Sequence, residues 1–156
     1  MAGFEWRYNI GGGPPLIKTY VMKDTETLTK GDLLNLETGE VDLAATADTA
    51  LIGVMLGADD PLKEVNASGE RTPGKVSGTA ATTVIKAIIN PDAVYSTADA
   101  NARNAGATLD ISGATGAQGV AASSNTEFVV VERKLQTADP TYVKIIETIH
   151  YLTKSQ

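Results

Sequence analysis

The sequence predicts a mainly β protein: a compact β-barrel or sandwich-like domain with one short helix and an extended N-terminal arm. Three observations indicate this class. β-Branched and aromatic residues gather in runs of strand length, turn-forming residues separate the runs at short spacing, and only one stretch has the start and stop signals of a helix. The 156 residues suit a single domain with an appendage. We divide the chain into an arm over 1–15 and a β-rich body over 16–156.

The arm carries three aromatic residues at alternate positions, Phe4, Trp6 and Tyr8, followed by Ile10. Alternate positions of a strand face one side, and aromatic side chains are frequent anchors of interfaces. We therefore interpret these four residues as partner-binding residues that dock on another chain by strand addition. The alternative is that they fold back and complete the core or sheet edge of their own domain. Flexible glycines and stiff prolines follow and predict a hinge, formed by Gly11, Gly12, Gly13, Pro14 and Pro15.

The first half of the body is predicted to be a succession of strands. A β-branched and aromatic run predicts a strand over 16–22, and a Thr-Gly pair between two short apolar stretches predicts a hairpin over 30–44. The apolar run over 50–60 contains two glycines, which indicate a buried strand with a bulge or a close backbone approach. We expect a loop with one short strand over 63–80, and a strand over 82–90 that ends at a proline.

The one predicted helix lies over 96–106. Thr97 suits an N-cap, the alanine-containing stretch that follows favours helix, and Gly106 suits a C-terminal cap. Such a helix would have only about two turns.

Three segments complete the body. Small residues over 108–124 predict a loop or a weak strand, and the β-branched run over 127–135 predicts a strand. The segment 142–152 has apolar residues at helical spacing, yet its isoleucines, valine, threonine and tyrosines favour a strand, which is the prediction we adopt.

Composition bounds the function. The net charge is −6 and the thirteen basic residues are scattered, so we predict no nucleic-acid partner. The chain has no cysteine, which excludes disulfides, thiolate catalysis and cysteine-ligated zinc. We find neither a signal peptide nor an apolar run near the roughly 20 residues that span a bilayer, and expect a soluble protein made in a cytoplasm, without a membrane partner.

Residues that could carry chemistry are few. The single histidine, His150, would have to serve any Ser-His-Asp triad, but no nucleophile elbow accompanies it, which favours an ordinary histidine on a strand. The glycines over 11–13 lack the Lys-Ser/Thr of a phosphate loop. Asp59, Asp60 and Asp99 could bind a hard cation, but no EF-hand spacing surrounds them. We predict no catalytic residue, no metal, no cofactor and no enzyme activity.

Two long runs resemble a known family. The run TLTKGDLLNLETGEVDLAATADTALIGVML (27–56) resembles the opening of tailed-bacteriophage head decoration proteins, also called capsid cement proteins. The run INPDAVYSTADANARNAGATLDISGATGAQGVAASSNTEFVVVERK (89–134) is similar to the family's second half, and the resemblance extends over about 16–152. The shared motifs are compositional and include a Lys-Gly-Asp turn and a Gly-Ala-Thr-hydrophobic-Asp turn. The N-terminal arm has no counterpart that we can match.

The resemblance implies a structural protein on the outer surface of the virion. Such proteins bind the expanded phage head, commonly as trimers, and stabilise it against the pressure of packaged DNA. The implied partners are the major capsid protein and further copies of the chain in a homotrimer. Two alternatives stay open: another small virion component from the tail or the head–tail connector, and a carbohydrate-binding module or small hydrolase.

Overall fold

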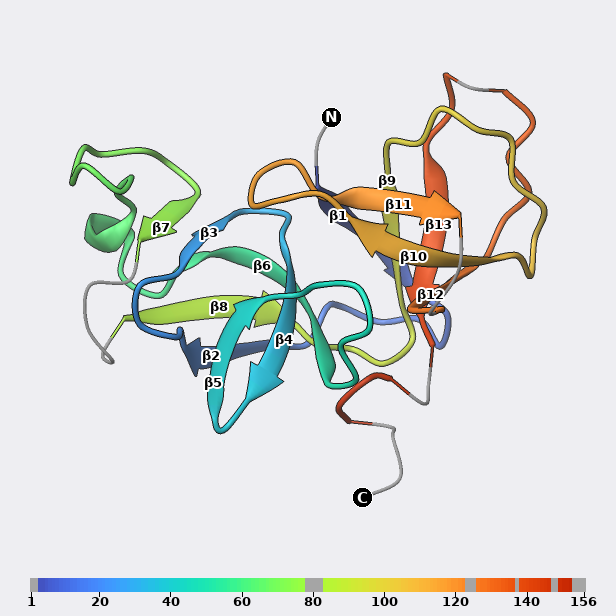
Figure 1. Ribbon diagram of the computed structural model, residues 1–156. Coiled ribbons are helices and arrows are strands. Elements are labelled where there is room, and N and C mark those ends of the chain that lie inside the picture. The colour runs from blue at the N-terminus through green and yellow to red at the C-terminus, as the bar shows by residue number, and fades with distance from the viewer. Residues whose placement is uncertain (1–2, 78–82, 123–125, 137, 147–148, 153–156) are drawn as a thin grey trace.

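The computed structural model describes residues 3–77, 83–122, 126–136, 138–146 and 149–152. Within these ranges the protein is mainly β, with three antiparallel sheets, one 3-10 turn and no α-helix (Figure 1). The six-stranded sheet has the order β1 (Phe4–Asn9), β9 (Ala93–Thr97), β13 (Thr141–Ile145), β12 (Phe128–Val130), β10 (Thr108–Ser112) and β11 (Gly119–Ala122). The five-stranded sheet has the order β2 (Ile17–Val21), β8 (Val84–Ile88), β6 (Leu51–Ala58), β4 (Leu33–Glu37) and β5 (Glu40–Leu43). A ribbon pairs β3 (Thr27–Thr29) with β7 (Lys75–Ser77), and the 3-10 turn is η1 (Pro61–Lys63).

The two larger sheets lie side by side, and each curls so that its edges approach (Figure 1). In the five-stranded sheet the end of β2 reaches β5, where Lys23 N–H donates to the Val41 carbonyl at 2.8 Å. In the six-stranded sheet Gly3 N–H, before β1, donates to the carbonyl of Gln118, before β11, at 2.8 Å. No ladder joins either pair of edge strands in the described residues, so the predicted barrel is not closed.

Strand β6 is buried on both faces and separates two hydrophobic cores. Leu51 and Val54 belong to the core between the sheets, whereas Ile52 and Met55 belong to the core inside the curl of the five-stranded sheet. A strand that is covered on both faces needs no polar alternation, which explains the unbroken run LIGVMLGA.

The two glycines of β6 act as the sequence predicts. A Cβ on Gly53 would lie 1.7 Å from the Ile88 carbonyl oxygen, so the close backbone approach is confirmed. The register of β6 against β8 shifts between Met55 and Gly57, which confirms the bulge.

The local strand predictions are largely confirmed. Glu37 and Glu40 pair across a two-residue turn whose Thr38 and Gly39 have φ of 50° and 88°, as a type I′ hairpin requires. Strands form within 16–22, 50–60 and 82–90, and β7 is the short strand expected within 63–80. Two further strands, β10 and β11, form where a loop or weak strand was expected.

The predicted helix over 96–106 is wrong. Thr97 ends β9 instead of capping a helix. The backbone of Arg103 makes no helical turn, because its N–H donates to the Lys134 carbonyl at 3.2 Å and its carbonyl accepts from Lys134 N–H at 2.8 Å. The Asp99 carboxylate accepts from Asn101 N–H at 3.1 Å, a local bond that competes with helix formation.

The strand predicted over 142–152 is correct only in its first part. β13 ends at Ile145, and the described residues 149–152 form a turn that packs along the start of β6. There, Leu51 N–H donates to the Ile149 carbonyl at 3.1 Å, and Tyr151 N–H donates to the Leu51 carbonyl at 2.7 Å.

Buried polar side chains join the two sheets. Asp32, at the Lys-Gly-Asp turn before β4, accepts hydrogen bonds from Thr115 Oγ1 at 2.6 Å and Gly116 N–H at 2.9 Å. Gln118, before β11, makes a second link between the sheets, because its Oε1 accepts from Leu33 N–H of β4 at 2.6 Å. Burial raises the pKa of Asp32, and the hydrogen bonds from Thr115, Thr29 and Gly116 offset this rise only in part. Asp32 and Gln118 are both buried, and these bonds supply partners for their side-chain oxygens.

Candidate interaction surface

The aromatic residues at the N-terminus lie on β1, which pairs with β9 of the same chain. Phe4 is buried, and its ring stacks on Phe128 with the centroids 5.1 Å apart. Trp6 is half-buried against the same core, and its Nε1 donates to Asn9 Oδ1 at 3.0 Å. For these two side chains the structure has the alternative arrangement, in which the segment completes its own sheet edge.

The other two residues of the predicted site reach solvent. Tyr8 is 36% exposed, and its hydroxyl donates to Glu132 Oε1 at 2.7 Å. This hydrogen bond, together with burial and the negative charge of Glu132, raises the pKa of Tyr8 to about 12. Ile10 follows the strand and is 57% exposed. The exposed part of the predicted docking set is therefore at the C-terminal end of β1.

The predicted hinge connects β1 with β2 and is fastened at several points. Gly11 N–H donates to Asp92 Oδ2 at 2.8 Å. The Nδ2 group of Asn9 donates to the carbonyls of Gly13 and Pro14, at 3.3 and 3.0 Å. Since Asn9 is itself buried, it holds this turn onto the sheet edge. The glycines supply the positive φ of the turn, with φ of 86° at Gly13.

A pocket of about 300 Å³ opens beside β1. Its lining is mainly apolar and comes from β1, the connection, β2, β6 and β8: Phe4, Trp6, Pro15, Ile17, Val54 and Ile88. Lys30 and Glu5 stand at the same pocket. Sequence reasoning missed this pocket because its walls come from strands that are far apart along the chain. Phe4 and Trp6 stood out in the sequence, but nothing local linked them to Ile17, which the structure leaves 46% exposed.

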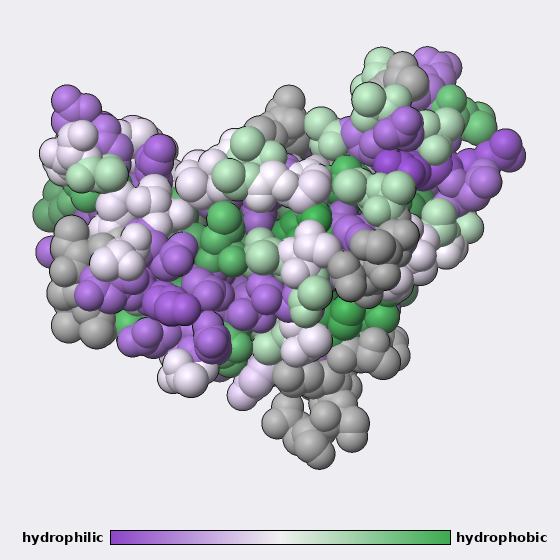
Figure 2. Space-filling view, in the orientation of Figure 1, coloured by the Kyte–Doolittle hydropathy of each residue, from purple (hydrophilic) through white to green (hydrophobic). Residues whose placement is uncertain are grey.

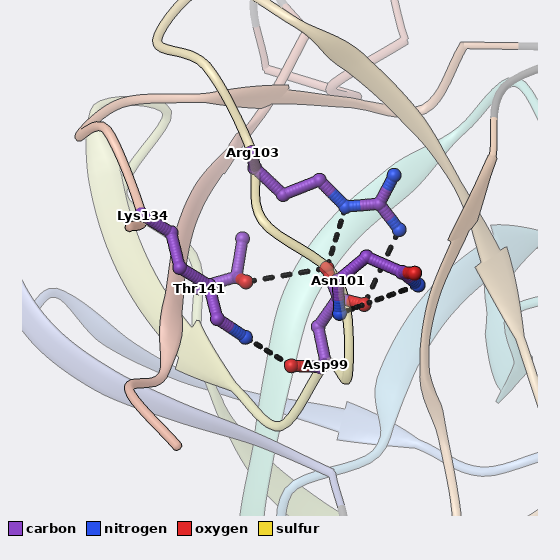
Figure 3. Close-up of polar contacts among 5 residues, drawn as sticks. All are labelled: Asp99, Asn101, Arg103, Lys134 and Thr141. Atoms are coloured by element: carbon purple, nitrogen blue, oxygen red, sulfur yellow. Dashed lines mark hydrogen bonds and ion pairs between the residues drawn. The ribbon is translucent and has the colours of Figure 1, made fainter. Parts of the chain in front are cut away.

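A polar cluster holds the loops at the far end of the six-stranded sheet (Figure 3). The Asp99 side chain is 3% exposed; its Oδ2 accepts from Arg103 Nε at 2.6 Å and from Thr141 Oγ1 at 3.3 Å. The ammonium group of Lys134 donates to the Asp99 backbone carbonyl. Burial alone would raise the pKa of Asp99, but the hydrogen bonds from Arg103 and Asn101 outweigh it and lower the pKa. This cluster therefore holds the loop after β9 against the segments that contain Lys134 and Thr141.

His150 is buried at an isolated bridge with Leu51, in the C-terminal turn and not on a strand. Its Nδ1 accepts from Leu152 N–H at 3.2 Å. Burial lowers the pKa of His150 to about 4, which keeps the ring neutral at physiological pH. A neutral ring that accepts a backbone N–H holds the C-terminal turn in place.

The remaining sequence candidates are exposed carboxylates. Asp60 Oδ1 accepts from Leu62 N–H at 3.0 Å and caps η1. The described residues contain no group of three or more histidine, cysteine or acidic side chains able to hold a metal ion. Among the same residues, no helix is long and apolar enough to cross a membrane.

No protein-family model matches the chain, and no curated protein matches it.

Proposed function

We propose that the protein is a structural decoration, or cement, protein that binds the outer surface of an expanded tailed-phage head. It would stabilise the head against internal DNA pressure, with the major capsid protein and further copies of itself, as a homotrimer, as partners. The observation that carries the proposal is the resemblance of the two long runs 27–56 and 89–134. These runs include β3 to β5, most of β6, and β9 to β12, which contribute residues to both cores.

The charge distribution supports an outward position. Hydrophilic side chains gather over the β4–β5 hairpin, as Figure 2 shows. This hairpin carries the acidic residues Glu37, Glu40 and Asp42, with Lys23 paired to Glu37 at 3.1 Å. An acidic surface suits solvent and is repelled by the phosphates of packaged DNA.

We propose separate roles for the N-terminal segment and the body. The segment 1–15 is the contact element of a sandwich-like body over 16–156. Phe4 and Trp6 secure β1 to its own core, and Tyr8 and Ile10 present exposed side chains to the capsid or to a neighbouring subunit. An interface anchor needs this combination of a held backbone and an accessible apolar group.

Co-sedimentation with undecorated expanded heads of the phage that encodes the chain tests this proposal. The wild-type chain should pellet with the heads at many copies per particle, and Ile10→Asp should bind at least tenfold more weakly, because it places a charge in an apolar contact. Leu135→Asp is the matched control, because Leu135 is 67% exposed against 57% for Ile10 and follows the six-stranded sheet's β12. It should bind as the wild type does.

Three results would count against the proposal. If the wild-type chain stays in solution, it is not a decoration protein. If it pellets as only one ring of copies per head, the connector alternative takes its place. If Ile10→Asp and Leu135→Asp bind equally well, heads are decorated but β1 is not the contact element.

A further inference from the structure

An apolar knob, Leu62, stands at the edge of a hollow of about 440 Å³ in the five-stranded half of the protein, which Asp59, Asp60 and Lys63 also line. Leu62 lies in η1 and is 68% exposed, slightly more than any other large hydrophobic side chain in the described residues. The turn is held in shape, because Asp60 caps the Leu62 N–H and Glu64 N–H donates to the Pro61 carbonyl at 3.2 Å. Figure 1 shows η1 at the outer end of this half, away from the six-stranded sheet. An exposed leucine on a fixed turn is suited to insertion into another surface.

The base of the knob is also fixed. The Glu64 carboxylate accepts from Ala58 N–H at 3.3 Å and from Gly74 N–H at 3.0 Å, and so ties η1 to the end of β6. Around Leu62 the exposed charges are those of Asp59 and Asp60 before it and Lys63 after it. The knob therefore has an apolar tip with a predominantly acidic collar.

The pocket beside β1 has the complementary character. Its walls are apolar, and Lys30 stands both at this pocket and at an adjoining hollow of about 510 Å³. Lys86 lies two residues before Ile88 on β8 and so shares the face on which Ile88 lines the pocket. Neither lysine forms an ion pair with another described residue.

The carboxylates near the pocket are already engaged. Glu5 accepts from Arg7 at 3.1 Å, and Glu64, which lines the adjoining hollow, is turned toward backbone amides. The pocket is thus a mainly apolar socket with Lys30 in its lining and Lys86 on the same face of β8, on a chain whose net charge is −6.

We propose that Leu62 of one copy inserts into the pocket beside β1 of a second copy, with Asp59 and Asp60 next to Lys30 and Lys86. Charge complementarity selects a second copy as the occupant, because the exposed Asp59 and Asp60 beside Leu62 would lie next to Lys30 of the pocket lining, which forms no ion pair with another described residue. The pocket of one subunit is completed by a residue of the next, and the contact deepens the self-association that the proposed function includes. Burying an exposed leucine in an apolar pocket supplies the hydrophobic part of the interface.

Cysteine pairs test the contact directly, because the natural chain has none. Copies carrying Leu62→Cys are mixed with copies carrying Ile17→Cys and oxidised. The expected result is a disulfide-linked dimer in the mixture, and far less from either variant alone. Leu135→Cys, at a position that is 67% exposed, is the matched control and should give no dimer with Ile17→Cys.

Charge reversal provides a second test of the contact. Lys30→Glu in the Ile17→Cys copy should reduce cross-linking at least tenfold, and Asp59→Lys in the Leu62→Cys copy should restore it. Asp59 is chosen because Asp60 caps η1, so the turn remains intact. Circular dichroism checks that every variant is folded.

Either of two outcomes overturns the inference. One is equal cross-linking of Ile17→Cys with Leu62→Cys and with Leu135→Cys. The other is a wild-type chain that sediments as a monomer up to millimolar concentration, together with no cross-link between Leu62→Cys and Ile17→Cys. Head binding is scored separately with the wild-type chain. If the protein binds heads but the variants do not cross-link, the proposed function stands and the Leu62 contact is wrong. If the variants cross-link but the protein does not bind heads, the contact stands and the proposed function is wrong.

Discussion

At the residue scale, single side chains near the two ends of the chain anchor those ends to the body. Phe4 fills the core between the sheets and stacks on Phe128, and His150 closes the C-terminal turn over Leu51. The aromatic pattern of the N-terminus could be recognised from the sequence, since alternation is a local property. Its division into buried Phe4 and exposed Tyr8 could not, because that depends on the partner strand β9, almost ninety residues away.

Truncating Phe4 should destabilise the fold. Phe4→Ala removes a buried, stacked ring and should lower the free energy of unfolding by about 3 kcal/mol or more. Tyr8→Ala removes a partly exposed ring and one exposed hydrogen bond, and should cost about 1 kcal/mol or less. Urea unfolding followed by circular dichroism measures both. Equal losses would mean that Phe4 does not belong to the core.

His150 should make stability depend on pH. Its pKa is lowered to about 4 in the folded protein by burial, with the nearby charge of Lys144 acting in the same direction and a backbone hydrogen bond with Ile52 opposing them. As the pH falls below the ordinary histidine pKa, His150 becomes protonated in the unfolded chain but stays neutral in the folded chain, so protonation favours unfolding. This stability is fully present above about pH 6.5 and is lost between pH 6.5 and 4, a loss of up to about 3 kcal/mol.

The test compares unfolding free energies at pH 7.5 and 4.5 for the wild type and for His150→Gln. The variant cannot titrate at this position, so its loss between the two pH values should be smaller by about 2 kcal/mol. Taking the difference within each protein removes any cost of the substitution itself. Equal losses in both proteins would show that His150 is not buried in its neutral form.

At the element scale, strands whose signals are local could be predicted, and elements decided by distant partners could not. The hairpin around Thr38 and Gly39 follows from turn chemistry, and β6 follows from its apolar run with two glycines. The segment 96–106 has helix signals, but the backbone of Arg103 pairs with Lys134, and no local rule anticipates that bridge. Tertiary hydrogen bonds outweigh a weak propensity of a two-turn helix.

The glycines provide a test of the β6 packing. A Cβ on Gly53 would clash with the Ile88 carbonyl at a φ of 143°, so Gly53→Ala should cost at least about 4 kcal/mol or prevent folding. Gly39→Ala is the control, because Gly39 also has positive φ, 88°, but no atom lies within 4 Å of its Cβ position. It should cost only about 1–2 kcal/mol. Thermal unfolding compares the two, and similar melting temperatures would contradict the close contact of β6 with β8.

At the scale of the whole molecule, two curled sheets pack together: β6 of the five-stranded sheet lines both hydrophobic cores, and buried polar residues join the two sheets. The mainly β class could be predicted from composition and spacing, but the sheet order could not, because the pairs that define it join strands distant in sequence. The pocket beside β1 was missed for the same reason. The four side chains predicted to dock on a partner are divided by the fold: Phe4 and Trp6 pack against the core, and Tyr8 and Ile10 reach solvent.

Glu127 should stabilise the packing of the two sheets against each other. It is buried, with Oε1 accepting from Ala47 N–H at 2.8 Å and Oε2 from Ile111 N–H at 2.9 Å. Glu127→Ala leaves both amides without this partner and should cost about 2–4 kcal/mol. Amide exchange at Ala47 should also accelerate. Glu132→Ala, at an exposed site, is the control; a protein equally stable with either substitution would contradict this role.

The proposed decoration role is best tested by counting the wild-type chains that saturate undecorated expanded heads and by measuring the temperature at which those heads lose their DNA. We expect saturation at hundreds of copies per head and a higher release temperature for decorated heads than for bare ones. Failure to bind, or binding at a single ring of copies with no change in DNA release, would contradict it.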